Sequence, residues 1–289
     1  MAIAGLSPAP WGQPQAAVLS GERLHLQHGP IDLVIGVEGE SAERRQAYHA
    51  AHQRFQSVLG ELVGALTILR QPLPGTGEQA PVLASPIARR MVAGCWPHRR
   101  IFITPMAAVA GAVADEILAA MLVAAPNVQT AYVNNGGDIA LHVADGRELK
   151  IGVVRDLLRA VPEGVISVTP ESGIGGIATS SWRGRSFSLG IADAVTVLAR
   201  TAAAADAAAT LIANAVNADD PAISRRPARA LDADSDLGER LVTTAVGSLS
   251  DMTCAEALAA GLAETDRQLN AKHILGAMLA LQGHWVCRP

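Results

Sequence analysis

The chain has 289 residues, of which 49% are hydrophobic, 17% are charged and 3% are aromatic, with a formal net charge of −4. This length suffices for one large domain or two small ones with a sizeable core. The basic residues occur in scattered pairs and form no stripe interleaved with aromatic residues, which argues against a nucleic-acid partner.

The cysteines and the amino-terminal residues indicate the compartment. Cys95, Cys254 and Cys287 are odd in number and far apart, which argues against a disulfide framework and for a reducing compartment. The first fifteen residues lack the basic and apolar regions of a signal peptide. No run of about eighteen uninterrupted apolar residues occurs, so no membrane span is expected. We therefore expect a cytoplasmic protein.

The first half of the chain predicts strands followed by helices. Residues 1–15 are expected to form a flexible lead-in, and residues 16–39 two strands around a glycine-containing turn. Apolar residues at three- and four-residue spacing predict a long helix from Ser41. Ser85-Pro86 and Thr104-Pro105 predict the starts of two further helices, because Pro is favoured in the first turn.

From Gln129 onward the pattern changes to strands. The expected strands are AYVNN, DIALHV, LKIGVV, GVISVTP, GIGGIATSS, RSFSLG and AVTVLAR. Thr201 is expected to cap an Ala-rich helix, residues 217–236 to form a surface excursion, and VTTAVGSL to form the last strand. Thr253 and Glu256 make a capping box that predicts a final helix from Cys254.

This order of elements contains no βαβ alternation. It predicts an α+β fold, with a mostly antiparallel sheet flanked by Ala-rich helices. Without a repeat or an obvious linker, residues 16–289 are expected to form a single domain with two lobes.

The run YVNNGGDIALHV, Tyr132 to Val143, is the most informative stretch. Gly and Asn reach left-handed backbone conformations at little cost, so NNGGD between two apolar strands is typical of a β-hairpin turn. The neighbouring Ala-rich helices and ATSS turn favour a second interpretation, in which the turn shapes a ligand pocket. Its candidate residues are Asn134, Asn135, Gly136, Gly137 and Asp138.

The two Ala-rich helices allow both structural and functional interpretations. MAAVAGAVADEILAAML is apolar on every side and is typical of a buried helix, although N–H groups around Met106 to Val109 could also bind an anion. In AAAADAAATLIANAV, Asp206 and Thr210 are four residues apart and share a face. Their oxygens would suit Mg²⁺, whereas the structural alternative is an Asp paired with a buried Arg or with backbone donors.

Two further patterns carry candidate ligands. In GIGGIATSSWRGR, Thr179 and Ser180 could contact a phosphate or a flavin edge, and a tight turn with solvent-exposed arginines is the alternative. Cys95 with His98, and His49 with His52, have metal-like spacing. Neither pair has a matching second pair, so the spacing is weak evidence for zinc.

In their order along the chain, these motifs resemble the ApbE family, flavin transferases that move FMN from FAD onto a target protein. VNNGGDI matches the family's VNxGGDI fully, Ala178-Thr179-Ser180 matches the start of ATSG, and AGAVAD occupies the place of KGYAVD with Asp115 preserved. AVTVLARTAAAADAAAT resembles SVTV…ADALST. The resemblance implies an ApbE-like fold, a flavin ligand (FAD or FMN), and Mg²⁺ bound by Asp206 and Thr210.

One departure from the family changes the expected function. The transferases carry an H-I-I-D-P-x-T-G segment between ATSG and SVTV, whereas this chain has the shorter WRGRSFSLGIAD, without histidine. Asp193 is either a remnant of that segment or does not align with it. The chain therefore resembles the cytoplasmic branch that lacks this segment, a branch associated with tetrahydromethanopterin-linked one-carbon metabolism.

We expect a protein that acts on or binds a phosphorylated, nucleotide-like small molecule with Mg²⁺, and that is not a standard protein flavinylase. A Mg²⁺-dependent transferase or hydrolase of a phosphorylated cofactor is favoured. A non-catalytic cofactor-binding protein, or a biosynthetic protein of one-carbon metabolism, is the alternative. The sequence allows a homo-oligomer.

Overall fold

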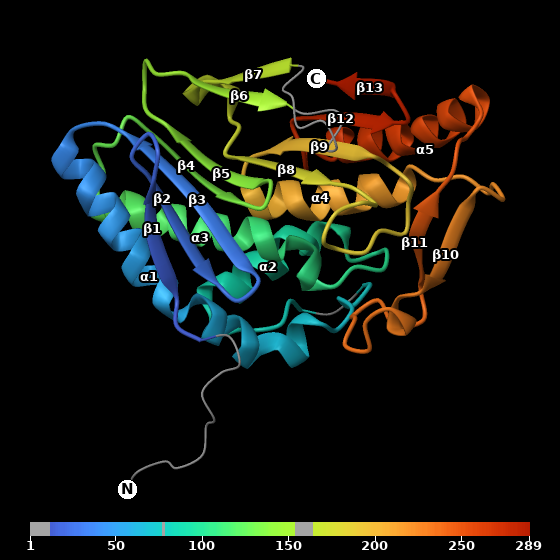
Figure 1. Ribbon diagram of the computed structural model, residues 1–289, viewed down its shortest axis with the longest axis horizontal. Coiled ribbons are helices and arrows are strands. Elements are labelled where there is room, and N and C mark those ends of the chain that lie inside the picture. The colour runs from blue at the N-terminus through green and yellow to red at the C-terminus, as the bar shows by residue number, and fades with distance from the viewer. Residues whose placement is uncertain (1–11, 77–78, 154–163) are drawn as a thin grey trace, which may run out of the picture.

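The computed structural model describes residues 12–76, 79–153 and 164–289, and within them one large sheet dominates the fold (Figure 1). Its nine strands follow the order β1-β2-β3-β4-β5-β8-β9-β12-β13, and every neighbouring pair is antiparallel. Two separate two-stranded sheets, β6-β7 and β10-β11, complete the strand content of these residues. The predicted α+β class with an antiparallel sheet is confirmed.

The amino-terminal region forms three strands, where two were expected. They are β1 (Gln15–Leu19), β2 (Arg23–His28) and β3 (Ile31–Glu38). Gly21 and Gly29 both have positive φ, 73° and 56°, so each supports a tight turn and the segment reverses twice. Residues 1–11 of the predicted lead-in lie outside the described residues, and β1 already begins at Gln15.

The helices pack on one face of the sheet (Figure 1). They are α1 (Ser41–Leu69), α2 (Pro86–Cys95), α3 (Val109–Ala124), α4 (Ala202–Ala215) and α5 (Asp251–Asn270). α3 contacts β4 and β5, α4 contacts β8 and β9, and α2 packs against α3 and α4. Short 3-10 turns also occur: η1 (Trp96–His98), η2 (Pro105–Ala108), η3 (Pro170–Ser172) and η4 (Ala228–Ala230).

The remaining strands confirm most of the expected ones. They are β4 (Thr130–Asn135), β5 (Asp138–Val143), β6 (Leu149–Val153), β7 (Gly164–Val168), β8 (Gly176–Ser180), β9 (Ala194–Ala199), β10 (Ile223–Pro227), β11 (Leu241–Val246), β12 (Gly276–Leu281) and β13 (His284–Arg288). VTTAVGSL is therefore not the last strand, because β12 and β13 follow it. Part of the expected surface excursion is β10, which pairs with β11.

The expected strand RSFSLG is not a strand. Its backbone makes one bond to a strand, where the Ser188 carbonyl accepts from the Thr243 N–H of β11 over 2.8 Å, and it also bonds to asparagine side chains near the end of α4. Leu189 N–H donates to Asn214 Oδ1 over 2.8 Å, and Leu189 C=O accepts from Asn217 Nδ2 over 2.9 Å. These bonds satisfy the backbone outside a ladder, so alternation alone gave the wrong element here.

Two of the predicted helix caps have different outcomes. Thr201 caps α4 as expected, accepting from the Ala204 N–H over 3.2 Å. The predicted capping box of Thr253 and Glu256 is wrong, because Ser250 caps α5 and accepts from the Thr253 N–H over 3.1 Å. Ser250 offers a hydroxyl three residues before Thr253, so the helix begins earlier than expected.

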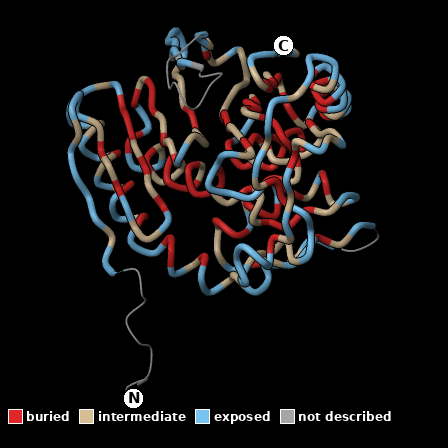
Figure 2. Tube along the Cα trace, turned by 45° about the vertical axis from the view of Figure 1, so that its right-hand side comes forward, coloured by how far each residue is buried: buried red, intermediate tan, exposed pale blue. Residues whose placement is uncertain are grey.

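Buried residues concentrate between the sheet and the helices (Figure 2). α4 is shared by two apolar clusters: Ala203 and Ala207 belong to one with α1–α3, and Ala208 and Ile212 belong to another with α5 and β12. A third, smaller cluster packs β6-β7 onto the opposite face of the sheet, around Leu141 and Ile177. The small side chains of α4 thus allow it to serve both main clusters at close range.

By length and composition, the segment Pro105–Ala124 is apolar enough to cross a membrane, and 44% of its apolar 18-residue window is buried inside the structure. It comprises η2 and α3, and α3 contacts α1, α4, β4 and β5. An added Cβ at Gly111 would collide with the carbonyl of Ala202, so α3 and α4 approach backbone to backbone. We therefore interpret this segment as the central helix of the fold.

Candidate functional site

The NNGGD segment is the tight turn that joins β4 to β5. Asn135 pairs with Asp138 across it, and the two glycines between them have φ of 66° and 114°, as the left-handed turn requires. The Gly137 N–H donates to Asn134 Oδ1 over 2.8 Å. Asn135 is buried, and its Nδ2 donates to the Ala110 carbonyl over 3.1 Å. The hairpin prediction is confirmed, and Asn135 ties the turn to the start of α3.

The ATSS segment lies beside this turn because β8 pairs with β5. The Thr179 N–H donates to Asp138 Oδ1 over 3.3 Å, and the Thr179 hydroxyl lies 2.9 Å from the Thr196 hydroxyl on β9. Ser180 follows at the end of β8. The two motifs, forty residues apart in the sequence, thus form one surface.

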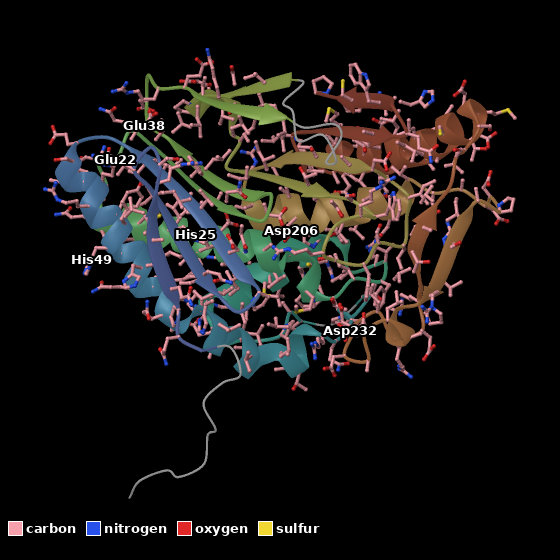
Figure 3. All side chains as sticks on the ribbon, in the orientation of Figure 1. Glu22, His25, Glu38, His49, Asp206 and Asp232 are labelled. Atoms are coloured by element: carbon pink, nitrogen blue, oxygen red, sulfur yellow. The ribbon has the colours of Figure 1, made fainter. Side chains whose placement is uncertain are left out.

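Asp206 on α4 faces the same surface and lies near the centre of the molecule (Figure 3). Its Oδ2 accepts from the Gly111 N–H of α3 over 3.0 Å. Thr210 is one helical turn further along α4, and both side chains line the cavity that contains Asp138. The predicted shared face of Asp206 and Thr210 is confirmed as geometry.

The two carboxylates influence each other electrostatically. Burial raises the pKa of Asp138 to about 7, against the lowering effects of the Thr179 N–H and the Arg185 guanidinium. Burial also raises the pKa of Asp206 well above its usual range, and the neighbouring charge of Asp138 raises it further. Two like charges in a poorly solvated place favour either a proton or a cation between them.

These side chains line a cavity of about 540 Å³ under the GGD turn. It contains every residue predicted for the ligand and the metal: Asn134, Asn135, Gly136, Gly137, Asp138, Thr179, Ser180, Asp206 and Thr210. A second cavity of about 340 Å³ adjoins it, lined by the start of α3 and by the loop that holds Asp232, Asp234 and Asp236. The sequence did not indicate this acidic loop as part of the site, because nothing local connects it to the GGD turn.

The donor set suits a hard cation. Two carboxylates and a threonine hydroxyl offer oxygen ligands, the kind that Mg²⁺ prefers. A cation between the carboxylates would also relieve the repulsion by which Asp138 raises the pKa of Asp206. Asp206 and Thr210 would hold the ion together with oxygens of a ligand. Across the described residues, no group of three or more His, Cys, Asp or Glu side chains is arranged to hold a metal alone.

Asp115, the preserved Asp of AGAVAD, has a different role. Its carboxylate accepts from the N–H groups of Ala202 and Ala203 over 3.0 and 2.9 Å, at the first turn of α4. It lines neither cavity. Sequence reasoning missed this contact because the partners lie 87 and 88 residues away.

The segment that replaces the family's histidine segment is also structural in part. Asp193 accepts from Trp182 Nε1 over 3.2 Å and from the Gln282 N–H over 2.6 Å, and it lines neither cavity. Arg185 lines both cavities and Arg183 lines the larger. No histidine occurs among the residues that line these two cavities in the described part of the chain.

The pairs with metal-like spacing do not converge on a site. The Cys95 thiol donates to the Thr104 carbonyl over 3.5 Å, whereas the His98 ring packs edge-to-face against His273, with ring centroids 5.0 Å apart. His49 and His52 are exposed, and His49 lies on the outer side of α1 (Figure 3).

The fold and site together define an α+β protein with an oxygen-lined, glycine-edged cavity between an antiparallel sheet and two Ala-rich helices. The family model described as AbpE bacteria matches residues 15–287. The chain therefore belongs to this family, within the ApbE-like superfamily.

Known relatives agree with this assignment. A "UPF0280 protein" of Methanothrix thermoacetophila is 39% identical over 137 residues, which are 47% of this chain and 54% of the relative. One of Methanoculleus marisnigri is 44% identical over 122 residues, 42% of this chain and 49% of the relative. The chain thus spans about half the length of the curated relatives it matches.

Two solved structures are similar at 13% sequence identity. The ApbE protein of Thermotoga maritima has a TM-score of 0.42, and the superposed region covers 71% of this chain and 87% of the Thermotoga chain. The apo flavinyl transferase ApbE of Pseudomonas stutzeri has a TM-score of 0.46 and covers 96% and 95%.

Proposed function

We propose that this protein binds a phosphorylated, nucleotide-like ligand in the two adjoining cavities, with Mg²⁺ held by Asp206 and Thr210. A flavin such as FAD or FMN is the favoured ligand because the chain belongs to the ApbE-like superfamily. The observation that carries the proposal is the meeting of Asp138 and Asp206 where the two cavities overlap. Two carboxylates there disfavour an anionic ligand unless a cation accompanies it.

The chain's own residues supply the rest of the site. The left-handed glycines of the GGD turn keep backbone close to the ligand, and Thr179 and Ser180 offer hydroxyls along β8. Mg²⁺ would neutralise phosphate oxygens and polarise a phosphorus–oxygen bond. This combination supports an enzyme that transfers or hydrolyses a phosphorylated cofactor.

A standard protein flavinylase is disfavoured because such a reaction needs a general base near the acceptor hydroxyl. The family's histidine segment is replaced, and the lining residues of both cavities include no histidine in the described residues. A cofactor-binding protein of tetrahydromethanopterin-linked one-carbon metabolism is the second candidate, in which the ligand is held without cleavage.

Ligand binding is tested by differential scanning fluorimetry with FAD, FMN, ADP and a tetrahydropterin, each with and without Mg²⁺. We expect a Mg²⁺-dependent rise in melting temperature with the phosphorylated ligands. Asp206→Asn and Thr210→Val should abolish the Mg²⁺-dependent part, whereas Asp145→Asn, an exposed aspartate outside both cavities, should keep it. No shift with any ligand in the wild type would refute the proposal.

Catalysis is tested by incubating the protein with FAD and Mg²⁺ and separating the products by chromatography. Release of FMN that is lost in Asp206→Asn supports the enzyme, and stable binding without release supports the cofactor-binding alternative. Covalent flavin on a threonine peptide acceptor, detected by mass spectrometry, would contradict the claim that the chain is not a standard flavinylase.

A further inference from the structure

The overlap of the two cavities has an unusual set of lining side chains. The residues that line both are Ala110, Asp138, Ser180, Arg185, Ser186, Asp206 and Thr210. In this shared set, and for the residues that the structure describes, Arg185 carries the single positive charge. A guanidinium therefore faces the two carboxylates at the point where a ligand would pass from one cavity into the other.

Arg185 is held in this position by two distant segments. Its Nη1 donates to the Pro30 carbonyl in the β2-β3 turn over 3.2 Å. On the other side, its Nη2 lies against Gly136, where an added Cβ would collide with it. The first glycine of the GGD turn thus has two uses, since it adopts a φ of 66° and leaves room for the guanidinium.

The guanidinium retains donors for a ligand. It has five N–H groups in a planar fork. Its bond to Pro30 uses one, and this is the hydrogen bond that Arg185 makes among the described residues. Its side chain is exposed at the rim rather than enclosed, so an approaching anion can reach it.

The charge of Arg185 already reaches Asp138, because it lowers the pKa of that carboxyl against the raising effect of burial. A phosphate group placed at the overlap would be repelled by Asp138 and Asp206. Arg185 offsets part of that repulsion, and a planar fork can bind two phosphate oxygens at once.

Arg183, two residues earlier, is a useful contrast. It lines the larger cavity alone, pairs with Asp193 at 3.5 Å and stacks over the Trp182 ring at 4.7 Å. Its charge and its planar face therefore already have partners within the protein.

We infer that Arg185 binds a phosphate of the ligand at the overlap of the two cavities and so selects phosphorylated over unphosphorylated ligands. This inference rests on the proposed function, because it names one recognition element of the same site. Arg185 acts by binding and orienting the phosphate and takes no part in proton transfer.

The test compares riboflavin, FMN and FAD as ligands in flavin-fluorescence titrations with Mg²⁺. We expect Arg185→Gln to weaken FMN and FAD binding at least tenfold and to leave riboflavin binding within about twofold. Arg185→Lys, which keeps the charge and loses the fork, should show an intermediate loss. Arg147→Gln, an exposed arginine outside both cavities, serves as the matched control, and melting temperatures confirm folding.

The outcomes separate this inference from the proposed function. If the wild type binds FMN and Arg185→Gln binds it equally well, the inference is overturned and the proposed function stands. Equal losses in Arg183→Gln and Arg185→Gln would also overturn it, since a general field effect would then explain both. If the wild type binds none of the three flavins, nor ADP, both fail.

Discussion

Asp115 and Asp206 are both carboxylates within Ala-rich helices, and each accepts a backbone N–H from near the start of the other's helix. Asp115 accepts from the N–H groups of Ala202 and Ala203 of α4, and Asp206 accepts from the N–H group of Gly111 of α3. Their surroundings differ. Burial raises the pKa of both carboxyls; the Ala202 and Ala203 N–H groups and the nearby Arg90 oppose this rise at Asp115, whereas Asp138 adds to it at Asp206. Asp206 lines both cavities, and Asp115 lines neither.

This difference distinguishes a structural aspartate from a functional one in a buried Ala-rich helix. A buried aspartate is expected to be paired, and Asp115 has its donors and a neighbouring cation within the protein. Asp206 has backbone donors at Gly111 and Ala110, but a second carboxylate and a cavity adjoin it instead of a cation. Spacing and composition place both residues in similar contexts, so contacts alone distinguish them.

Replacing Asp115 should have the largest effect on stability. Asp115→Ala leaves the Ala202 and Ala203 N–H groups without their acceptor in a buried place, which should cost about 4 kcal/mol in the free energy of unfolding. Asp206→Asn keeps an oxygen for Gly111 and removes a like charge, so its stability should equal or exceed that of the wild type. Urea denaturation without Mg²⁺ measures the stability of both variants. Equal destabilisation by Asp115→Ala and Asp206→Asn would contradict the distinction between a structural Asp115 and a ligand-binding Asp206.

The pH dependence of stability should report the Asp138–Asp206 pair. The folded pKa of Asp138, about 7, lies above the usual value of 3.8, so the folded state binds more protons between these values. Its stabilising contribution is complete below pH 3.8 and is lost as pH rises through 7. The slope is on the order of 1.4 kcal/mol per pH unit, and water in the cavity reduces it. Asp138→Asn should flatten this slope in metal-free denaturation curves.

Mg²⁺ provides the matching control for this slope. A cation binds the ionised carboxylates, so added Mg²⁺ should stabilise the wild type more at pH 7.5 than at pH 5. A wild type that keeps the metal-free slope unchanged in saturating Mg²⁺ would contradict the assignment of the pair to a cation site.

The sequence predicted the elements wherever the signal was local. Periodicity located α1, Ser85 and Thr201 marked the starts of α2 and α4, and NNGGD marked the hairpin. The predicted helix start at Thr104-Pro105 is instead the 3-10 turn η2, and α3 begins at Val109. The errors occurred where distant partners decide the conformation. The RSFSLG segment bonds to Asn214 and Asn217, and the Asp232–Asp236 loop reaches the second cavity by tertiary packing.

The candidate site was predictable through the motifs, and its chemistry was not. The residues named from the NNGGD, ATSS and Asp206 motifs line one cavity, because β5, β8 and α4 meet there. The role of Asp115 depends on a contact with Ala202, about ninety residues away in the sequence. The position of Arg185 depends on Pro30, about one hundred and fifty residues away, and on Gly136, about fifty residues away. Local patterns carry no information on such contacts.

The protonation of His98 gives stability a pH dependence opposite in sign to that of the Asp138–Asp206 pair. This contribution must be subtracted before the contribution of the carboxylate pair can be determined. Burial lowers the pKa of His98 to about 4 from a usual 6.5, and the charges of His273 and Arg267 lower it further, while Glu264 raises it. Its neutral form is stable above pH 6.5, and stability falls as pH decreases towards 4, on the order of 1.4 kcal/mol per pH unit. His98→Phe should remove this acid-side loss and leave the slope above pH 6.5 unchanged. A slope that also changes above pH 6.5 would show that the two effects are coupled.

Replacing Thr201 should have the smallest effect and should sharpen the contrast at the start of α4. Thr201 accepts from the Ala204 N–H, while Asp115 accepts from Ala202 and Ala203, so the two residues satisfy different donors of one helix terminus. Thr201 is exposed, and water can replace its hydroxyl. Thr201→Ala should therefore cost about 1 kcal/mol, a typical value for an N-cap, and should leave ligand binding unchanged. If thermal and urea denaturation showed a cost equal to that of Asp115→Ala, the sensitivity would belong to the helix start in general. The special position of Asp115 between α3 and α4 would then lose its support.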